Sequence, residues 1–347
     1  MTRGAVSGFA IVAALAAGIA QSEVSRELRL SIPVSGSVTV ENLAGRMTIV
    51  PGDGDELTIV ATVHAESEKL AATVRLAEVG GPINTRTVRV IYPTATHRRF
   101  RYPHAGRSQV EYGDERVTVS GTGGVLLWAE VAVTVPRRDV DATFRNLVGT
   151  LSGEGLSGRI LLDAAAGDIH GRNLAGKVTA DTGSGDVLVE GSRGSLVCDT
   201  GSGGCEVRQF DGNRVRCDTG SGTIDLADVR ATRVEADAGS GDIRSAGLDA
   251  EDITVSTGSG SVELGIAGTR LARAQLDTGS GDVELSLPPD AAFELLTDIG
   301  SGDLVCRFAD ARATVEHRLV VGYTRGSGGA LIDVDTGSGS VIVRPAT

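Results

Sequence analysis

The stretch Asp181-Thr182-Gly183-Ser184-Gly185-Asp186-Val187 decides the fold of this chain, because variants of it recur throughout the C-terminal half. All eight full copies keep the central Gly-Ser-Gly, and a degenerate copy begins at Asp163. The full copies begin at Asp181, Asp199, Asp218, Asp237, Ser256, Asp277, Asp298 and Asp335. Their starts are 18, 19 or 21 residues apart, except for a last step of 37. A fixed period of this size predicts a stack of structural repeats.

The residues on either side of each corner alternate between apolar and polar types. Val178 and Ala180 flank Thr179 before one corner, and Ile224 and Leu226 flank Asp225 after another. Alternation of this kind is typical of a β-strand with one buried face. Each repeat is therefore predicted to be a strand, a Gly-rich corner, a second strand and a return loop.

One such unit cannot bury its own apolar face, but units stacked about 4.8 Å apart would share a continuous core. The predicted fold is all-β. It is a parallel β-solenoid, that is, a single-stranded β-helix with about 18–21 residues per coil. The strong preference of parallel crossover connections favours right-handed winding. The corner glycines are expected to supply positive φ, and the Thr and Ser hydroxyls to cap free backbone groups.

The chain divides into three predicted parts. Residues 1–20 read as a secretory signal peptide, with a basic start, a short apolar run and small residues before a cleavage site after Ala20. Residues 21–136 read as an N-terminal β region with worn repeats. Residues 137–347 form the regular solenoid, which is expected to end on an open-edged strand at 341–345. The mature protein is expected to be exported without a later membrane span.

A basic, aromatic-containing loop at 93–115 interrupts the N-terminal region. It contains the run Arg98, Arg99, Phe100, Arg101 and Tyr102. On a chain with a formal net charge of −12, such a loop is a candidate contact site for an acidic partner or a surface polymer. A solvated tip without a role is the alternative.

Composition limits the classes of partner. The net charge of −12 argues against nucleic acid or anionic lipid as the main partner. Glycine supplies 48 of the 347 residues, and only 3% are aromatic, as a thin solenoid requires. We therefore expect a surface polymer or an envelope protein as the partner, and no cofactor.

The first Asp of each corner is predicted to fall in a column along the stack. Carboxylates about 5 Å apart repel one another unless they form hydrogen bonds, take up protons or hold cations. A calcium-binding column is therefore one hypothesis, and an architectural role in the corner is the other. The members of the column are Asp181, Asp199, Asp218, Asp237, Asp277, Asp298 and Asp335.

Three of the four cysteines lie close together in the repeat pattern. Cys198 and Cys217 occupy the same inward position in successive repeats, and Cys205 occupies an inward position across the corner. Export would permit disulfides. Reduced core cysteines and one disulfide among the three are both compatible with the pattern, since in-register parallel neighbours have Cβ atoms somewhat too far apart for the bond. A zinc site is not expected, because no histidine accompanies them.

The strand Val131–Pro136, followed by weak and then GSGD-type repeats, resembles the bacterial putative-adhesin family of β-strand repeats. The resemblance implies an exported or envelope-associated protein, in the periplasm, at the cell surface or outside the cell. The predicted function is a non-enzymatic structural or adhesin-like binding module. Two alternatives remain, a carbohydrate-active enzyme on a β-helix scaffold and a calcium-stabilised surface repeat protein.

Overall fold

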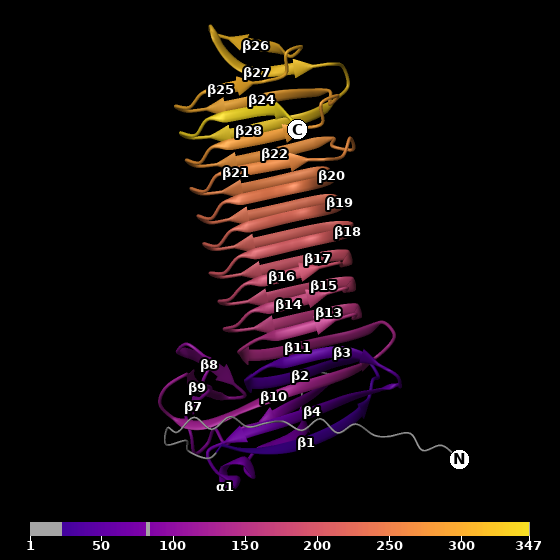
Figure 1. Cartoon of the computed structure of the whole chain (residues 1–347), viewed down its shortest axis with the longest axis vertical. Helices are drawn as coiled ribbons and strands as arrows, with labels where there is room; N and C mark the ends of the chain where they lie inside the picture. Colours follow the sequence, from indigo (N-terminus) through magenta and orange to yellow (C-terminus); the bar gives the residue numbers. More distant parts are fainter. Residues whose placement is uncertain (1–22, 81–83, 347) are drawn as a thin grey trace, which may run out of the picture.

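A computed structural model describes residues 23–80 and 84–346 of the chain, and the predicted signal peptide lies outside these residues. The described residues form 29 β-strands and one short helix, α1 (Glu68–Ala71). The strands stack into one long column that is broader at its N-terminal end (Figure 1). The fold is all-β and its strands are mostly parallel, as the repeat pattern predicts.

Coils stacked in chain order make up the middle of the column. Their strands are β11 (Val140–Val148), β12 (Leu151–Glu154), β13 (Ser157–Ala164), β14 (Ile169–Arg172), β15 (Ala175–Thr182), β16 (Val187–Glu190), β17 (Arg193–Thr200), β18 (Cys205–Thr219), β19 (Ile224–Ala238), β20 (Ile243–Thr257), β21 (Val262–Ile266), β22 (Arg273–Thr278) and β23 (Val283–Leu287). Equivalent residues of successive copies pair in parallel register, so that Asp181 lies between Asp163 and Asp199. The apolar residues of the alternating pattern are buried between the two strand faces.

The N-terminal end departs from this order. Its strands are β1 (Val24–Pro33), β2 (Ser37–Ala44), β3 (Met47–Gly52), β4 (Glu56–Ala65), β5 (Arg75–Val79), β6 (Thr85–Ile91), β7 (Arg99–Arg101), β8 (Ser108–Tyr112), β9 (Glu115–Ser120) and β10 (Val125–Pro136). The coil formed by β2 and β3 pairs with β11 and β12 on one side and with β6 and β10 on the other. Antiparallel pairing of β4 with β1 and β10 broadens this end.

The C-terminal end is also out of chain order. Its strands are β24 (Phe293–Ile299), β25 (Leu304–Cys306), β26 (Arg312–Glu316), β27 (Leu319–Arg325), β28 (Ala330–Thr336) and β29 (Val341–Pro345). The last coil of the chain is inserted below the one before it, since β28 pairs with both β22 and β24 and β29 pairs with both β23 and β25 (Figure 1). The expected open edge at 341–345 is therefore wrong. The hairpin of β26 and β27 lies beyond β24 instead.

Close stacking, more than positive φ, explains the corner glycines. Gly185 has a φ of 139°, but the equivalent glycines of the following coils do not adopt positive φ. A Cβ atom on Gly203 or Gly241 would instead overlap the backbone carbonyl oxygen of the equivalent glycine one coil away. The expectation that the corner glycines supply positive φ was therefore only partly correct. Most of them are required because the carbonyl oxygen of one corner occupies the space that a side chain on the next corner would fill.

A buried column of polar side chains runs through the corners. Thr219 is 1% exposed, donates to the carbonyl of Gly203 at 2.8 Å and accepts from the amide of Gly222 at 3.0 Å. The threonine hydroxyl thus satisfies backbone groups of its own coil and of the previous one, as the sequence predicted. The same donor contact recurs at Thr182, Thr200, Thr257, Thr278 and Thr336.

Asparagines continue this column at the N-terminal end. Asn42 and Asn146 pair in register and are fully buried. The Asn42 amide donates to the Asn146 Oδ1 atom at 2.9 Å, and the Asn146 amide donates to the carbonyls of Gly45 at 2.9 Å and Thr150 at 3.1 Å. At this less regular corner, the longer amide side chain supplies the hydrogen bonds that the backbone carbonyls need.

Candidate functional surface

The first Asp of each corner forms one column on the outside of the stack. The register places its members in the spatial order Asp163, Asp181, Asp199, Asp218, Asp237, Ser256, Asp277, Asp335 and Asp298. Every member predicted from the sequence is therefore in the column. The inserted last coil places Asp335 between Asp277 and Asp298, an order that the sequence does not reveal.

Charge in this column is compensated at some coils and left uncompensated at others. Arg145 pairs with Asp163 at 2.7 Å, and Arg216 pairs with Asp218 at 3.3 Å. Within the described part of the chain, no ion pair is formed by the other acidic members of the column. These are Asp181, Asp199, Asp237, Asp277, Asp335 and Asp298.

Two neighbouring carboxyls of the column have raised pKa values. Shielding from water by the adjoining coils, followed by the charges of Asp199 and Asp163, raises the pKa of Asp181 above its ordinary value. Shielding, followed by the charge of Asp218, raises the pKa of Asp199 in the same way. These two carboxyls therefore hold negative charge at a free-energy cost, which a cationic ligand would reduce.

A second set of aspartates in the corner has a structural contact that the sequence did not reveal. Asp186 accepts the backbone N–H of Gly204 in the next coil at 2.8 Å. Asp242 accepts the N–H of Ser261 at 2.9 Å, and Asp282 accepts that of Ser340 at 2.8 Å. These carboxylates join successive corners, which accounts for the second Asp of the GSGD pattern.

The column shows no preassembled cation site. Among residues 23–80 and 84–346, the only group that brings three acidic, thiol or imidazole ligand atoms within 4.8 Å of one another is Cys198, Cys205 and Cys217. Calcium binding by the aspartate column stays a prediction. The carboxylates line up in register without converging on one point.

Aspartates from three neighbouring coils line one groove near the C-terminal end. Asp277, Asp298, Asp333 and Asp335 line a shallow groove of about 310 Å³ on the outer face. Asp333 was not among the predicted site residues, because no other repeat carries an Asp at the equivalent position. Its departure from the repeat was the available signal.

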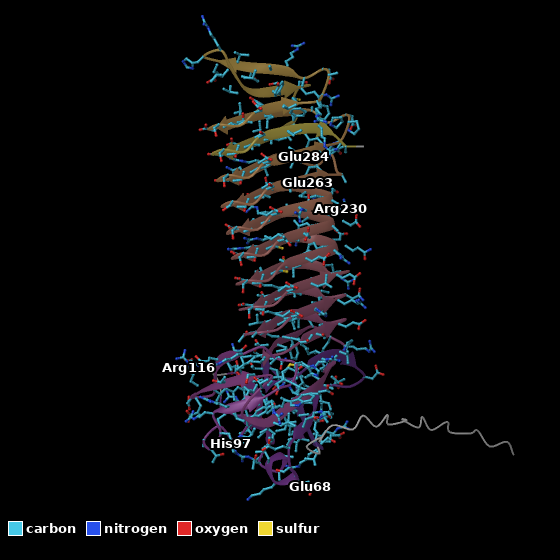
Figure 2. The ribbon with its side chains drawn as sticks, turned by 60° about the vertical axis from the view of Figure 1, so that its left-hand side comes forward. Glu68, His97, Arg116, Arg230, Glu263 and Glu284 are labelled. Atoms are coloured by element: carbon cyan, nitrogen blue, oxygen red, sulfur yellow. The ribbon has the colours of Figure 1, made fainter. Side chains whose placement is uncertain are left out.

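Ion pairs between coils cover other parts of the outer surface. Arg214 pairs with Glu235 at 2.5 Å, and Arg172 pairs with Glu190 at 3.2 Å. Figure 2 shows the labelled side chains of Arg230, Glu263 and Glu284 projecting outward at successive heights of the column. Surface pairs of this kind contribute little to stability.

The basic segment is not the aromatic-bearing loop that was predicted. Residues 93–115 include β7 and β8, and Phe100 and Tyr102 are buried, at 0% and 7% exposure. The two rings pack in the core, so they are not available as a surface platform, and that part of the prediction is wrong. Arg99 is exposed, whereas Arg98 forms an ion pair with Glu115.

The remaining members of the segment lie at the broad end of the column. Arg101 lies beside Phe100 on β7, and the labelled His97 and Arg116 are on the same end in Figure 2. Binding by the arginines of this segment stays a prediction. The alternation of Phe100 and Tyr102 around Arg101 is a strand signal that could have revealed their burial.

The three clustered cysteines are buried as the repeat register predicted. Cys198, Cys205 and Cys217 have free thiols and are at most 1% exposed. Cys306 is also free and is only partly buried. The predicted alternative of a disulfide among the three requires oxidation of thiols that already lie together.

The stacked corners and strands can now be compared with known proteins. A model of the Toastrack DUF4097 family matches residues 84–344. The chain belongs to this family. The Toastrack DUF4097 match spans most of the stack, and the family is a domain of unknown function.

The solved structures that the chain matches include a putative cell adhesion protein from Clostridium sporogenes ATCC 15579. It is 8% identical with a TM-score of 0.23, and the match covers 93% of this Toastrack chain and 100% of that one. A putative lipid binding protein from Parabacteroides distasonis ATCC 8503 is 11% identical with a TM-score of 0.35, covering 92% and 96% of the two chains. No curated protein matches the chain. The described residues contain no helix that is long and apolar enough to cross a membrane.

Proposed function

We propose that this chain is an exported, non-enzymatic β-solenoid that serves as a structural or adhesin-like binding module of the bacterial envelope or surface. The observation that carries the proposal is the in-register aspartate column, whose uncompensated carboxylates recur on the outside of successive coils. The proposal includes right-handed winding and coils of 18–21 residues.

The column suits a long partner better than a small one. Neighbouring carboxylates stand about 4.8 Å apart along the stack, and the exposed corner serines such as Ser184 and Ser202 add a hydroxyl at each level. An extended polymer that carries hydroxyl or ammonium groups could contact many levels at once. Many weak contacts along one ligand raise its overall affinity steeply. The favoured partner is therefore a surface polymer or an envelope protein with such groups.

The test is a binding screen of the full-length mature chain against purified envelope polysaccharides and envelope extracts. The column variant carries Asp181→Asn, Asp199→Asn, Asp237→Asn and Asp277→Asn. The matched control changes the same number of outward acidic residues on the opposite strands, with Glu206→Gln, Asp225→Asn, Glu263→Gln and Glu284→Gln. The column variant is expected to lose at least about tenfold in affinity, and the control to bind like the parent.

Two results would count against the proposal. Equal loss in both variants would assign binding to net charge alone, and cleavage of a bound polysaccharide would favour the alternative of a carbohydrate-active enzyme. Export is tested separately, by expressing the full chain in a bacterium and determining the N-terminal residue of the protein outside the cytoplasm. Cleavage after Ala20 is expected.

A further inference from the structure

Three sulfur atoms meet in the dry interior of the stack. Cys198 on β17 pairs in register with Cys217 on β18. Cys205 is the first residue of β18 and follows the corner that joins β17 to β18. The three Sγ atoms lie within 4.8 Å of one another, and all three residues are buried. Three of the four cysteines of the chain therefore form one cluster.

The surroundings of the cluster are apolar. Ala180 adjoins Cys198 on one side, and Ala236 adjoins Cys217 on the other. Cys205 lies between Val187 and Ile224. All four neighbours are at most 3% exposed. No charged side chain is in register with the sulfurs, so a ligand that leaves net charge at this point would be expensive to bury.

The thiols already favour one another as hydrogen-bonding partners. Hydrogen bonds from Cys205 and Cys217 lower the pKa of Cys198 to about 5 despite its burial. The contact with Cys198, together with burial, raises the pKa of Cys205 and of Cys217. The three Sγ atoms, all within 4.8 Å of one another, therefore converge on one another inside the core. This convergence is the arrangement that three sulfur ligands need around a single ion.

We propose that Cys198, Cys205 and Cys217 form a binding site for one trivalent thiophilic ion, of which arsenite is the test case. Soft sulfur ligands select soft ions. Arsenous acid reacts with three thiols to give a neutral As(SR)₃ centre and three water molecules. Three As–O and three S–H bonds break, three As–S and three O–H bonds form, and no oxidation occurs.

The charge balance separates this ion from zinc. A zinc ion held by three thiolates carries a net negative charge and requires a fourth ligand, and the apolar neighbours of this cluster supply none. The neutral trithiolate suits the dry core. Because the ligands come from adjacent coils, the bound ion would join β17 to β18 in the middle of the stack. This role is separate from the proposed binding of a polymer on the outer surface.

The test uses the full chain, purified with a thiol reductant and then freed from it without air. The protein is unfolded in urea and refolded with arsenite, and a second sample receives arsenite while folded. After gel filtration, intact mass spectrometry is expected to show one arsenic atom gained and three hydrogens lost. The loaded protein is expected to unfold at a higher temperature than the unloaded protein. Zinc chloride, used as the counter-probe, should not be retained.

Matched variants distinguish the cluster from general thiol chemistry. Cys217→Ala copies Ala236, which occupies the equivalent position in the next coil, and is therefore expected to fold. It should retain no arsenic after gel filtration. Cys306→Ala removes the distant cysteine and should bind arsenic like the parent. Circular dichroism of both variants checks that the stack is intact.

Three outcomes would overturn the proposal. The first is no arsenic in the refolded parent chain. The second is equal retention by Cys217→Ala. The third is a disulfide among these cysteines in protein isolated from cells without reductant, found by peptide mapping, which would show that the cluster is a cross-link instead of an ion site.

Discussion

The coils in the middle of the column stack in the order of the sequence, whereas those at the two ends do not. In the middle, the next coil in the sequence is also the next coil in space, as for Asp181 and Asp199. At the ends this correspondence fails. The first coil, at β2, stacks on β11, and the last coil, at β28, is inserted between β22 and β24. The repeat motif thus specifies how coils stack but not which coil follows which.

The difference arises because every coil presents nearly the same edge. The Gly-Ser-Gly corner and the threonine that precedes it can stack on any neighbouring copy. The Thr336 hydroxyl donates to the carbonyl of Gly281, which is 55 residues away in the sequence, just as the Thr200 hydroxyl donates to that of Gly185, which is 15 residues away. Local coils can form soon after one another, whereas the end coils must close long loops first. The ends are therefore where long-range contacts control stability.

Ending the chain at Gly329 is expected to have the largest effect. This truncation removes β28 and β29 from inside the stack, so β24 and β25 lose the strands that join them to β22 and β23. In a stack held by nearest-neighbour contacts, everything beyond the missing coil should detach. Limited proteolysis should cleave within 293–325 while the middle coils stay protected.

A different result would change the comparison. If 293–325 stays protected after truncation, the coil of β24 and β25 has moved onto β22 and β23, and the corners are interchangeable enough to repair a missing coil. The matched control replaces only the outward Leu331 and Asp333 by Ser and Asn. Its protease pattern should match that of the parent.

Asn146→Ala tests the N-terminal end and is expected to cost about 4 kcal/mol in the free energy of unfolding. The change leaves the buried carbonyl of Gly45 without its side-chain donor, at about 1–3 kcal/mol. It also removes one of the hydrogen bonds of the Thr150 carbonyl and one of those of the Asn42 amide, at about 0.5–1.5 kcal/mol each. Urea unfolding monitored by fluorescence of Trp128 in the same end gives the value. Asn146→Thr, which copies the middle of the column, should recover part of the loss. A cost below about 1 kcal/mol would mean that water replaces the amide.

Gly241→Ala tests close stacking in the middle and is expected to cost about 3 kcal/mol, the upper end for overpacking. A methyl group at this position would overlap the carbonyl oxygen of Gly222, which is rigid backbone. Gly106→Ala is the control, because nothing lies within 4 Å of a Cβ atom there. Thermal unfolding of both variants should separate them. Equal melting temperatures would show that the corners can shift apart.

The strands and the buried residues of the middle coils could be predicted from the sequence because the same pattern recurs in each repeat. The inward Val178 and Val187 and the aspartate column follow from period and alternation alone, and Cys198, Cys205 and Cys217 fall together for the same reason. The ends carry few copies of the motif. Neither the inserted β28 nor the pairing of Asn42 with Asn146 can be read from local pattern, because both depend on closing loops of many residues.

The aromatic residues of 93–115 show the same limit at smaller scale. Phe100 and Tyr102 stand in a basic run that resembles a surface loop, yet Tyr102 packs beside Trp128, with ring centroids 5.2 Å apart, and Phe100 beside Tyr92 at 5.7 Å. The arginines around Phe100 favoured the prediction of a surface loop, so the short strand β7 was not predicted. A tertiary partner, not the local composition, decides the burial of the two rings.

Acid should affect the two regions in opposite directions, and this is the smallest of the expected effects. In the middle, the pKa values of Asp181 and Asp199 are raised above their ordinary 3.8. Protonation removes charges that are shielded from water and that repel one another in the folded state, so stability rises as the pH falls through the folded pKa values toward 3.8. At the ends, the Arg86 and Arg98 hydrogen bonds lower the pKa values of Glu78 and Glu115, and the Arg325 hydrogen bond lowers that of Asp310.

For these end carboxylates the sign is reversed. Their stabilisation is complete above the ordinary pKa of 4.5 for Glu and 3.8 for Asp, and it is lost as the pH falls through the lower folded values. Hydrogen exchange at pH 7, 5 and 3.5, corrected for intrinsic rates, should show 175–200 gaining protection first and 85–91, 115–120 and 312–325 losing it last. Asp181→Asn with Asp199→Asn should abolish only the gain. If the middle instead loses protection between pH 7 and 5, the carboxylates of the column are held by a bound cation that protonation displaces, and the calcium hypothesis becomes the better account.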